Sequence, residues 1–273
     1  MALQLFPGPA VVGGYRLERL LGAGGSGQVY RARRERTGEQ VALKVLRDPR
    51  ALPLLARAMR VHHPNLVRTL KLGSSATASH VVMELLRGST LREVLAHRTA
   101  LDVPAAVAVM VPVLAALHAA HAADVCHGDL KPENVVLEPD GAEDVVVKVL
   151  DLGGLPPAGE GDAVVGSAGY LSPEQAAGEV VDARSDVFGA GVLLFELVTG
   201  RPPFAAATPV ATAYQIVHRP APRVEDVRLA PLLDVAMAKA PADRFATAAL
   251  FAQALADRVP PAALRDLRVA RGA

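Results

Sequence analysis

The glycine-rich stretch at residues 22–27, GAGGSG, constrains the fold more than any other part of the chain. Apolar and polar residues alternate before it, at 15–21, and after it, at 28–34. The alternation returns at 40–46, beyond the turn-forming sequence RTGE at 36–39. Because a period of two is typical of strands with one buried face, the glycines are predicted to lie at the tip of a β-hairpin. The whole segment therefore predicts three antiparallel strands.

The spacing of Gly22, Gly24 and Gly27 matches G-x-G-x-x-G, a pattern that more than one kind of nucleotide-binding fold uses. A dinucleotide-binding fold needs a helix directly after the glycines, because the N-terminus of that helix binds the pyrophosphate. Here a strand, a turn and a second strand follow, which excludes a dinucleotide oxidoreductase. A glycine hairpin lets the backbone lie against phosphates, although a glycine-rich hairpin without a ligand gives the same pattern.

The remaining chain divides into a strand-rich and a helix-rich part. Residues 48–61 predict one short helix, and residues 63–73 and 80–86 predict two more strands. Further along, the apolar spacing becomes helical, and helices are expected to dominate to the C-terminus. The expected fold class is α+β: a small antiparallel sheet of about five strands with one short helix at residues 1–86, then a larger, mainly helical part at 87–273.

Composition and charge exclude several classes of function. Hydrophobic residues make up 51% of the chain and charged residues 21%, as in a globular protein. A net charge of +1 gives no electrostatic basis for binding nucleic acid or an anionic membrane, so neither is expected as a partner. The single cysteine, Cys126, excludes an internal disulfide and suits a reducing compartment, so a cytoplasmic location is expected.

One apolar segment, Val103–Ala123, must be considered as a possible membrane-spanning helix. It carries no formally charged residue and is long enough to span a bilayer. It is also rich in alanine, which partitions weakly into lipid, and it contains Pro104 and Pro112. These features favour a helix buried inside a soluble protein, with Asp102 as its N-cap.

The sequence HGDLKPEN at residues 127–134 contains the groups that phosphoryl transfer requires. That reaction needs phosphates held in line, a metal ion to offset their charge, and a group that accepts the hydroxyl proton. Asp129 can take the proton, Lys131 can neutralise the γ-phosphate, and Asn134 can ligate Mg²⁺. Asp151, after an apolar strand, is a second candidate metal ligand, and Lys44 in the sequence VALK is a candidate cation for phosphate oxygens.

These motifs occur in the order of a known family. In sequence they are GAGGSGQV, VALK, HPNLV, VMELLRG, HGDLKPEN, DLG, GSAGYLSPEQ, SDVFGAGVLLFELVTGRPPF and PADRF. The chain resembles the bacterial eukaryotic-like serine/threonine protein kinases over nearly its whole length. The resemblance implies a two-lobed protein-kinase-like fold, ATP with Mg²⁺ or Mn²⁺, and transfer of the γ-phosphoryl group to a hydroxyl of a protein substrate.

The resemblance also implies roles for individual residues around the adenine ring. They are the gatekeeper Met83, the hinge backbone of Glu84 and Leu86, and the apolar residues Val29, Ala42 and Val136. Outside the nucleotide site, Glu174 is expected to pair with Arg244, and Asp186 to anchor the backbone of the catalytic loop. Ser167 stands where the family has a hydroxyl that faces the catalytic aspartate.

The first departure from the family pattern concerns Lys44, which the family pairs with a glutamate on the helix of the small lobe. No Asp or Glu occurs between Asp48 and Glu84, and the helix is shortened around Pro53. Lys44 is then held by Asp151, by the nucleotide alone, or by Asp48 from outside the helix. A protein partner that binds near the shortened helix is a further way to activate such a kinase.

The second departure concerns control by phosphorylation of the activation loop. Gly128 replaces the arginine that, in the family, receives a phosphate on the activation loop. The loop itself is short, and its hydroxyl-bearing residues lie only near its end, at Ser167, Tyr170 and Ser172. We therefore expect a domain that activation-loop phosphorylation does not control, and that is constitutively competent, partner-activated or inactive.

Two functions of different classes remain open from the sequence. An active protein kinase is favoured because Lys44, Asp129, Lys131, Asn134 and Asp151 are all present. A pseudokinase, acting as a nucleotide-binding or scaffolding module, is the alternative, and the missing helix glutamate favours it. A kinase that phosphorylates a small molecule also stays open, since a fold does not fix its substrate.

Overall fold

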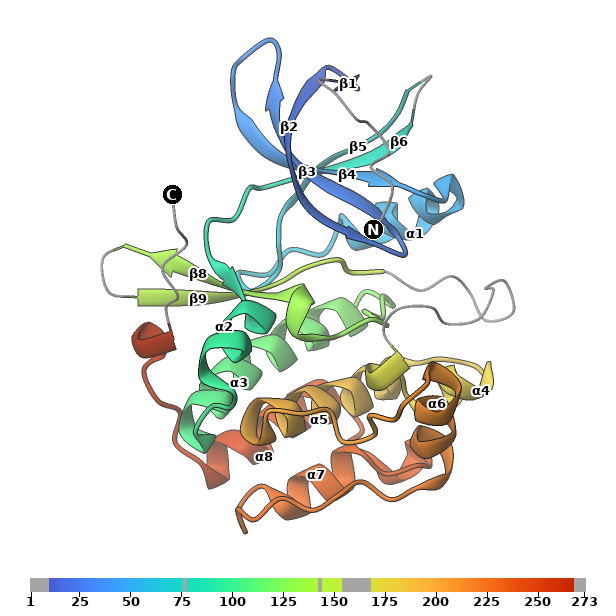
Figure 1. The fold of residues 1–273 in the computed structure, drawn as a ribbon, viewed down its shortest axis with the longest axis vertical. Coiled ribbons are helices and arrows are strands. Elements are labelled where there is room, and N and C mark those ends of the chain that lie inside the picture. Colours follow the sequence, from blue (N-terminus) through green and yellow to red (C-terminus); the bar gives the residue numbers. More distant parts are fainter. Residues whose placement is uncertain (1–9, 76–77, 142–143, 154–167, 268–273) are drawn as a thin grey trace. The chain divides into compact units, whose positions relative to one another are not determined.

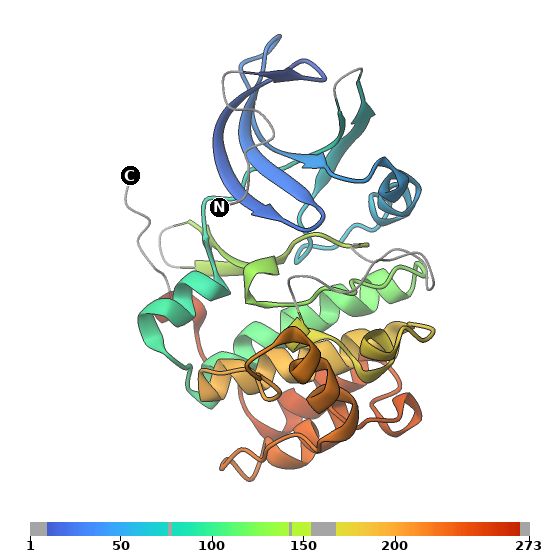
Figure 2. The same ribbon diagram turned by 45° about the vertical axis from the view of Figure 1, so that its right-hand side comes forward.

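The computed structural model describes residues 10–75, 78–141, 144–153 and 168–267. The chain divides into two compact units (Figures 1 and 2). Unit 1 comprises the described parts of Met1–His62 and Val67–Arg87, and unit 2 comprises those of His63–Leu66 and Gly88–Ala273. This is the α+β division into a small sheet-rich and a larger helical part that the resemblance implied.

Unit 1 is built on a six-stranded sheet in the order β1-β2-β3-β4-β6-β5, with every neighbouring pair antiparallel. Its strands are β1 (Val11–Val12), β2 (Tyr15–Gly24), β3 (Gly27–Arg34), β4 (Gln40–Leu46), β5 (Thr69–Ser74) and β6 (Ser79–Met83). The glycines lie at the turn between β2 and β3, so the predicted hairpin is confirmed. The sequence predicted about five strands and missed β1, whose two residues are too few to show a period.

The short helix of unit 1 begins later and ends earlier than residues 48–61. A 3₁₀ turn, η1 (Pro49–Ala51), leads into α1 (Leu52–Ala58), which has seven residues. Pro49 and Pro53 each lie in the first turn of their element, where a missing N–H costs nothing. The helix packs against the sheet through Leu52 and Leu55.

The alternation along β4 assigns its side chains to two opposite faces of the sheet. Val41, Leu43 and Val45 belong to the larger apolar cluster, which also contains residues of β1, β2, β3 and β6. Ala42 and Leu46 belong to the cluster on which α1 packs. The period of two therefore places Lys44, which lies between them, on the α1 side of the sheet.

Unit 2 is mainly helical. Its helices are α2 (Leu91–Arg98), α3 (Val103–His121), α4 (Pro173–Ala177), α5 (Ala183–Thr199), α6 (Pro209–His218), α7 (Ala230–Ala236) and α8 (Ala248–Arg258). A three-stranded sheet contains β7 (Ser89–Thr90), β8 (Val135–Asp140) and β9 (Asp144–Val149). The 3₁₀ turns are η2 (Pro132–Asn134), η3 (Ala168–Tyr170), η4 (Pro241–Asp243) and η5 (Leu264–Leu267).

The core of unit 2 is formed around α3 and α5, which pack against each other and against α8 (Figure 1). Asp102 caps α3, since its side chain accepts a hydrogen bond from the N–H of Ala105 at 2.8 Å, as predicted. By length and composition α3 could cross a membrane, but 61% of its most apolar window is buried within the fold. Burial of this kind is typical of a core helix.

The segment His63–Leu66 belongs to unit 2 because of its backbone contacts with β9. The side-chain amide of Asn65 donates to the carbonyl of Val147 at 2.9 Å, and the N–H of Val149 donates to the carbonyl of Asn65 at 2.8 Å. A parallel bridge joins Leu66 to Val149. These bonds satisfy polar groups of the HPNL motif that would otherwise be left without partners.

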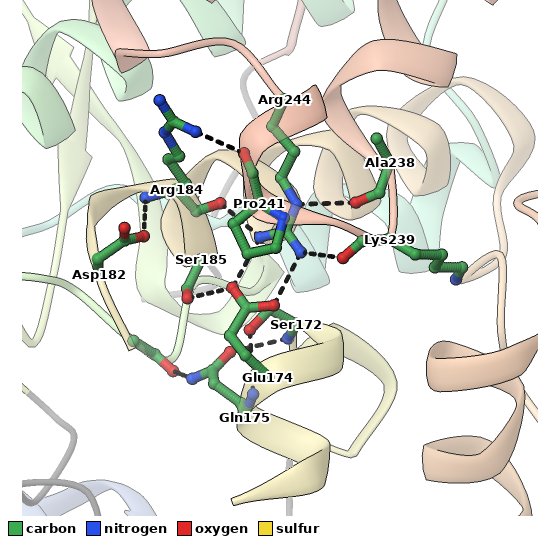
Figure 3. Close-up of polar contacts among 11 residues, drawn as sticks. Ser172, Glu174, Gln175, Asp182, Arg184, Ser185, Ala238, Lys239, Pro241 and Arg244 are labelled. Carbon is green, nitrogen blue, oxygen red and sulfur yellow. Dashed lines mark hydrogen bonds and ion pairs between the residues drawn. The ribbon is translucent and has the colours of Figure 1, made fainter. Parts of the chain in front are cut away.

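A buried ion pair between Glu174 and Arg244 joins α4 to the segment before α8 (Figure 3). Two parallel bonds of 2.7 Å connect the guanidinium to the carboxylate, which confirms the predicted pair. The remaining three N–H groups of Arg244 donate to the carbonyls of Arg184, Ala238 and Lys239. All five guanidinium donors are therefore satisfied, which is the condition under which a buried charge is tolerated.

Burial raises the pKa of the Glu174 carboxyl. The hydrogen bonds from Arg244 and Ser185 lower this pKa by more than burial raises it, so the net pKa lies below its usual value. Glu174 therefore stabilises the fold at pH values above the ordinary glutamate pKa, about 4.3. This contribution is lost as the pH falls through the lowered pKa.

Replacing Arg244 with Met leaves the Glu174 carboxylate buried without its counter-ion. We expect the free energy of unfolding at pH 7 to fall by about 3–5 kcal/mol, measured by urea denaturation. The difference from the wild type should shrink on acidification, because protonation removes the unpaired charge. Arg219→Met, at an exposed position, is the matched control and should change stability by less than about 0.5 kcal/mol. Equal effects of the two substitutions would contradict the assignment.

Candidate active site

Four of the residues predicted to contact the nucleotide lie on one face of the unit 1 sheet. Val29 is the cross-strand partner of Lys44, and Ala42 is the partner of Met83. Lys44 is itself buried, at 6% exposure, among the apolar side chains of this face. The strand register thus brings an apolar surface and one ammonium group together, as binding of an aromatic base and its phosphates requires.

The three glycines of the hairpin differ in their surroundings. A Cβ atom added at Gly22 or Gly24 would meet no protein atom within 4 Å. A Cβ at Gly27 would lie 2.1 Å from the carbonyl oxygen of Val45, and Gly27 has a φ of 153°. Gly27 is therefore required by the hairpin itself, whereas Gly22 and Gly24 leave the backbone open to a ligand. The sequence pattern does not distinguish these two roles.

The two predicted hinge residues follow β6. The N–H of Glu84 donates to the carbonyl of Arg68 at 3.0 Å, and the carboxylate of Glu84 accepts from the N–H of Arg68 at 2.8 Å. Leu86 is half-buried. Both the backbone and the side chain of Glu84 thus fix the chain as it leaves the sheet.

The missing acid of the small helix has no substitute in α1, whose sequence LPLLARA contains no carboxylate. The carboxylate of Asp48 accepts from the N–H of Arg50 at 2.9 Å, and its Oδ2 forms an ion pair of 2.8 Å with the guanidinium of Arg50. The hydrogen bond from the Arg50 side chain is the main reason that the pKa of Asp48 is lowered. Asp48 is therefore engaged with Arg50 at the start of η1.

In unit 2 the structure brings Asp129, Lys131 and Asn134 into direct contact. The ammonium of Lys131 lies 2.5 Å from Oδ2 of Asp129. The amide nitrogen of Asn134 donates to the carbonyl of Asp129 at 2.8 Å and lies 3.4 Å from its Oδ2. The turn η2, in which the N–H of Asn134 donates to the carbonyl of Lys131 at 2.9 Å, produces this arrangement.

The backbone of Asn134 also leads to the second candidate metal ligand. Its carbonyl accepts from the N–H of Leu150 at 2.8 Å, which fixes the residue before Asp151. Asp151 has a φ of 57°, in the left-handed region that non-glycine residues rarely adopt. Such backbone strain costs about 1–3 kcal/mol and is most frequent at functional sites.

A fully buried carboxylate, that of Asp186 in α5, holds the catalytic loop in place. The N–H groups of His127 and Gly128 donate to its two oxygens at 2.8 and 2.7 Å, which confirms the predicted anchor. Nε2 of His121 in α3 lies 2.7 Å from the same carboxylate. Burial raises the pKa of Asp186, but the hydrogen bond from His121 and those from the loop outweigh it, so the net pKa is lowered.

The ring of His127 bridges the loop and the end of β9. Its Nδ1 accepts from the N–H of Asp129 at 3.2 Å, and its Nε2 donates to the carbonyl of Leu150 at 2.8 Å. Neither His127 nor His121 was assigned a role from the sequence.

Gly128 is held through both its N–H and its carbonyl and has a φ of 75°. Its N–H reaches Asp186, and its carbonyl accepts from the side-chain amide of Gln175 at 2.8 Å. Gln175 also accepts from the N–H of Ser172, completing a capping box at the start of α4. The S-x-x-Q spacing was a signal for that cap, but not for the bond to Gly128. Ser167 lies outside the described residues, as does most of the activation loop.

The donor atoms present suit Mg²⁺ held together with a nucleotide. Among the described residues no group of three or more His, Cys, Asp or Glu side chains could hold a metal ion alone. Asn134 and Asp151 offer an amide and a carboxylate oxygen, the hard ligands that Mg²⁺ prefers. Mg²⁺ commonly takes its other ligands from water and phosphate oxygens, so two protein ligands are sufficient. Val136, the last predicted contact of the adenine ring, lies buried in β8.

Comparison with known proteins gives consistent matches. The model of the protein kinase domain family matches residues 15–255. A probable serine/threonine-protein kinase of Streptomyces coelicolor is 40% identical over 255 residues, covering 85% of this chain and 37% of the relative. The serine/threonine-protein kinase pkn3 of Myxococcus xanthus is 37% identical over 273 residues, covering 90% of this chain and 50% of the relative.

A third relative, the serine/threonine-protein kinase PknB of Mycolicibacterium smegmatis, is 38% identical over 263 residues. The match covers 86% of this chain but 41% of the relative, so the chain spans half or less of the length of these three proteins. The extent of the matches and the order of the motifs agree with the two-unit fold. The chain belongs to the protein kinase domain family and, within it, to the bacterial eukaryotic-like serine/threonine protein kinases.

Proposed function

We propose that this chain is an ATP-dependent serine/threonine protein kinase domain, which transfers the γ-phosphoryl group of ATP to a hydroxyl of a protein substrate. The observation that carries the proposal is the contact of Asp129, Lys131 and Asn134 in one loop whose backbone is fixed by Asp186. The three relatives described above are named as serine/threonine-protein kinases, which supports the same activity.

In the proposed reaction Asp129 orients the acceptor hydroxyl and takes its proton as the oxygen–phosphorus bond forms and the bond to ADP breaks. Lys131, 2.5 Å from Asp129, is placed to neutralise charge on the transferred group. Asn134 and Asp151 would hold Mg²⁺, which offsets the charge of the phosphates when bound. Positioning and electrostatics of this kind account for most of the catalysis of phosphoryl transfer.

The residues of unit 1 would bind the nucleotide. The apolar side chains of Val29, Ala42 and Met83 suit an adenine ring, and Lys44 on the same face suits the phosphates. The open backbone at Gly22 and Gly24 suits close approach of phosphate oxygens.

Control by activation-loop phosphorylation is not part of the proposal. The side chains of Asp186 and Gln175 hold the catalytic loop at the position where the family has a phosphate-binding arginine. The φ of 75° at Gly128 also suits glycine better than a branched or long side chain. A constitutively competent or partner-activated kinase fits these contacts.

The second candidate function is a pseudokinase that binds nucleotide or acts as a scaffold. The absence of a carboxylate from α1 favours it, because Lys44 then lacks its usual acidic partner on that helix. A protein partner that binds near α1 would reconcile this helix with activity.

We further propose a cytoplasmic location, which the burial of α3 and the single cysteine support.

The first test compares the wild type with Asp129→Asn and Lys44→Ala, using labelled ATP, Mg²⁺ and a generic protein acceptor. Loss of the proton acceptor should lower the turnover of Asp129→Asn by about 10²–10⁴-fold. Lys44→Ala should also weaken the reaction, because it removes the cation that faces the phosphates. Undiminished labelling by Asp129→Asn would contradict the kinase, and a nucleotide-induced melting shift without turnover in the wild type would favour the pseudokinase.

The hairpin glycines provide a second test, because their surroundings separate folding from nucleotide binding. Gly24→Ala should leave the melting temperature unchanged and raise the KM for ATP, since its Cβ projects into space that the protein leaves open. Gly27→Ala should destabilise the protein by about 3 kcal/mol or more, because its Cβ collides with the backbone of Val45. Loss of stability in Gly24→Ala would be inconsistent with a ligand-facing position.

The proposed regulation predicts that phosphatase treatment changes the rate of substrate phosphorylation by no more than about twofold. The measurement compares treated and untreated wild type, with phosphosites mapped in both samples. A Ser167→Ala variant serves as the control for phosphate at the end of the activation loop. A rate that falls tenfold or more on dephosphorylation and returns on rephosphorylation would overturn the idea.

A further inference from the structure

A cluster of charged and polar side chains on unit 2 surrounds Arg92 of α2. The Nε of Arg92 donates to Glu133 of the catalytic loop at 2.8 Å, and Nη1 donates to Glu196 of α5 at 2.8 Å. Its Nη2 donates to the hydroxyl of Tyr170 at 2.6 Å, and that hydroxyl donates to Glu196 at 2.5 Å. One guanidinium thus joins four segments that are distant in the sequence.

The cluster holds two carboxylates around one cation. Glu196 is buried, with 2% of its side chain exposed, whereas Arg92 and Glu133 are 40% and 45% exposed. Burial, together with the hydrogen bond to Glu196, raises the pKa of Tyr170 far above neutral pH, so its hydroxyl stays a neutral donor. Arg92 therefore covers a buried carboxylate and keeps part of its own guanidinium at the surface.

The position of the cluster relative to Asp129 matters for substrates. Glu133 follows Asp129 by four residues, so their Cα atoms are separated by no more than about 15 Å. An extended peptide advances about 3.3 Å per residue. An extended peptide whose hydroxyl reaches Asp129 therefore spans a distance equal to the Asp129–Glu133 separation within about four to five residues.

We propose that Arg92 is a specificity-determining residue: it occupies, from within the chain, the place where Glu133 and Glu196 would bind a basic side chain of the acceptor protein. The kinase therefore does not select acceptor sites with arginine or lysine at the corresponding position. The proposal rests on the proposed kinase function, because it concerns the acceptor of that reaction.

The fit of the guanidinium supports this role over a simple surface ion pair. Its Nε, Nη1 and Nη2 each reach a different acceptor, which the planar fork of arginine allows and the single ammonium of lysine does not. A guanidinium supplied by a peptide would find the same three acceptors once Arg92 is removed.

The test uses Arg92→Ala and paired serine peptides that carry either arginine or norleucine at one position within four residues of the serine. The wild type should phosphorylate both members of every pair with similar kcat/KM. Arg92→Ala should prefer the arginine peptide by about tenfold at one or two positions. Arg92→Ala/Glu133→Gln should lose most of that preference, because one carboxylate of the pair is gone.

Arg98→Ala is the matched control, since it removes an exposed positive charge from the same helix. It should show no preference between the paired peptides. A preference equal to that of Arg92→Ala would mean that general charge, and not the position of Arg92, determines selection, and would overturn the proposal.

Arg92→Ala leaves Glu196 buried without its cation, so a second variant protects the test against misfolding. Arg92→Ala/Glu196→Gln removes the buried charge and keeps Glu133, and it should prefer the arginine peptide by about threefold. Melting curves for each variant show whether it is folded. The proposal would be overturned if folded Arg92→Ala or folded Arg92→Ala/Glu196→Gln phosphorylated the paired peptides equally well.

Binding of fluorescein-labelled peptides, followed by anisotropy, separates this proposal from the proposed function. Arginine peptides that bind Arg92→Ala more tightly than norleucine peptides would support the role of Arg92 even if no variant transfers phosphate. Equal binding of both peptides in a folded, active Arg92→Ala protein would refute that role and leave the kinase function intact.

Discussion

The buried carboxylate of Asp186 is the interaction on which the active site of unit 2 depends. Moving a carboxylate out of water is costly, and it is tolerated only when hydrogen bonds satisfy its oxygens. Here those bonds come from the ring of His121 and from two successive N–H groups of the catalytic loop. The requirement to satisfy one charge therefore fixes the loop backbone relative to α3 and α5, and the ring of His127 extends the same order to Leu150, next to Asp151.

At two glycines, Gly27 and Gly128, the backbone limits which side chains this chain can accept. At Gly27 the carbonyl of Val45 leaves no room for a side chain, and at Gly128 a left-handed backbone lets both N–H and carbonyl reach their partners. A longer residue at Gly128 could keep these bonds only with a strained backbone. The loss of the arginine from the motif is thus compatible with a catalytic loop whose order comes from α4 and α5.

Local patterns predicted those parts of the structure whose cause is local. The period of two predicted the hairpin, and the N-cap at Asp102 followed from residue type. The pairs Glu174–Arg244 and Asp186 with its loop came only from the family resemblance, because their members lie 58 to 70 residues apart. Gln175 and Arg92 were missed, since a hydrogen bond to a distant backbone or side chain leaves no trace in nearby sequence.

The two departures from the family pattern, Gly128 in the catalytic loop and the missing carboxylate in α1, consequently differ in their expected effect on activity. In unit 2 the catalytic loop is fixed by side chains of α4 and α5, and Arg92 adds a further contact through Glu133. In unit 1 the short α1 supplies apolar side chains to the sheet but no carboxylate for Lys44. A lysine amine on a buried sheet face must be oriented by some anion to serve as a phosphate ligand. Under the proposed function, we therefore expect the activity of this domain to depend more on how Lys44 is held than on the glycine in the catalytic loop.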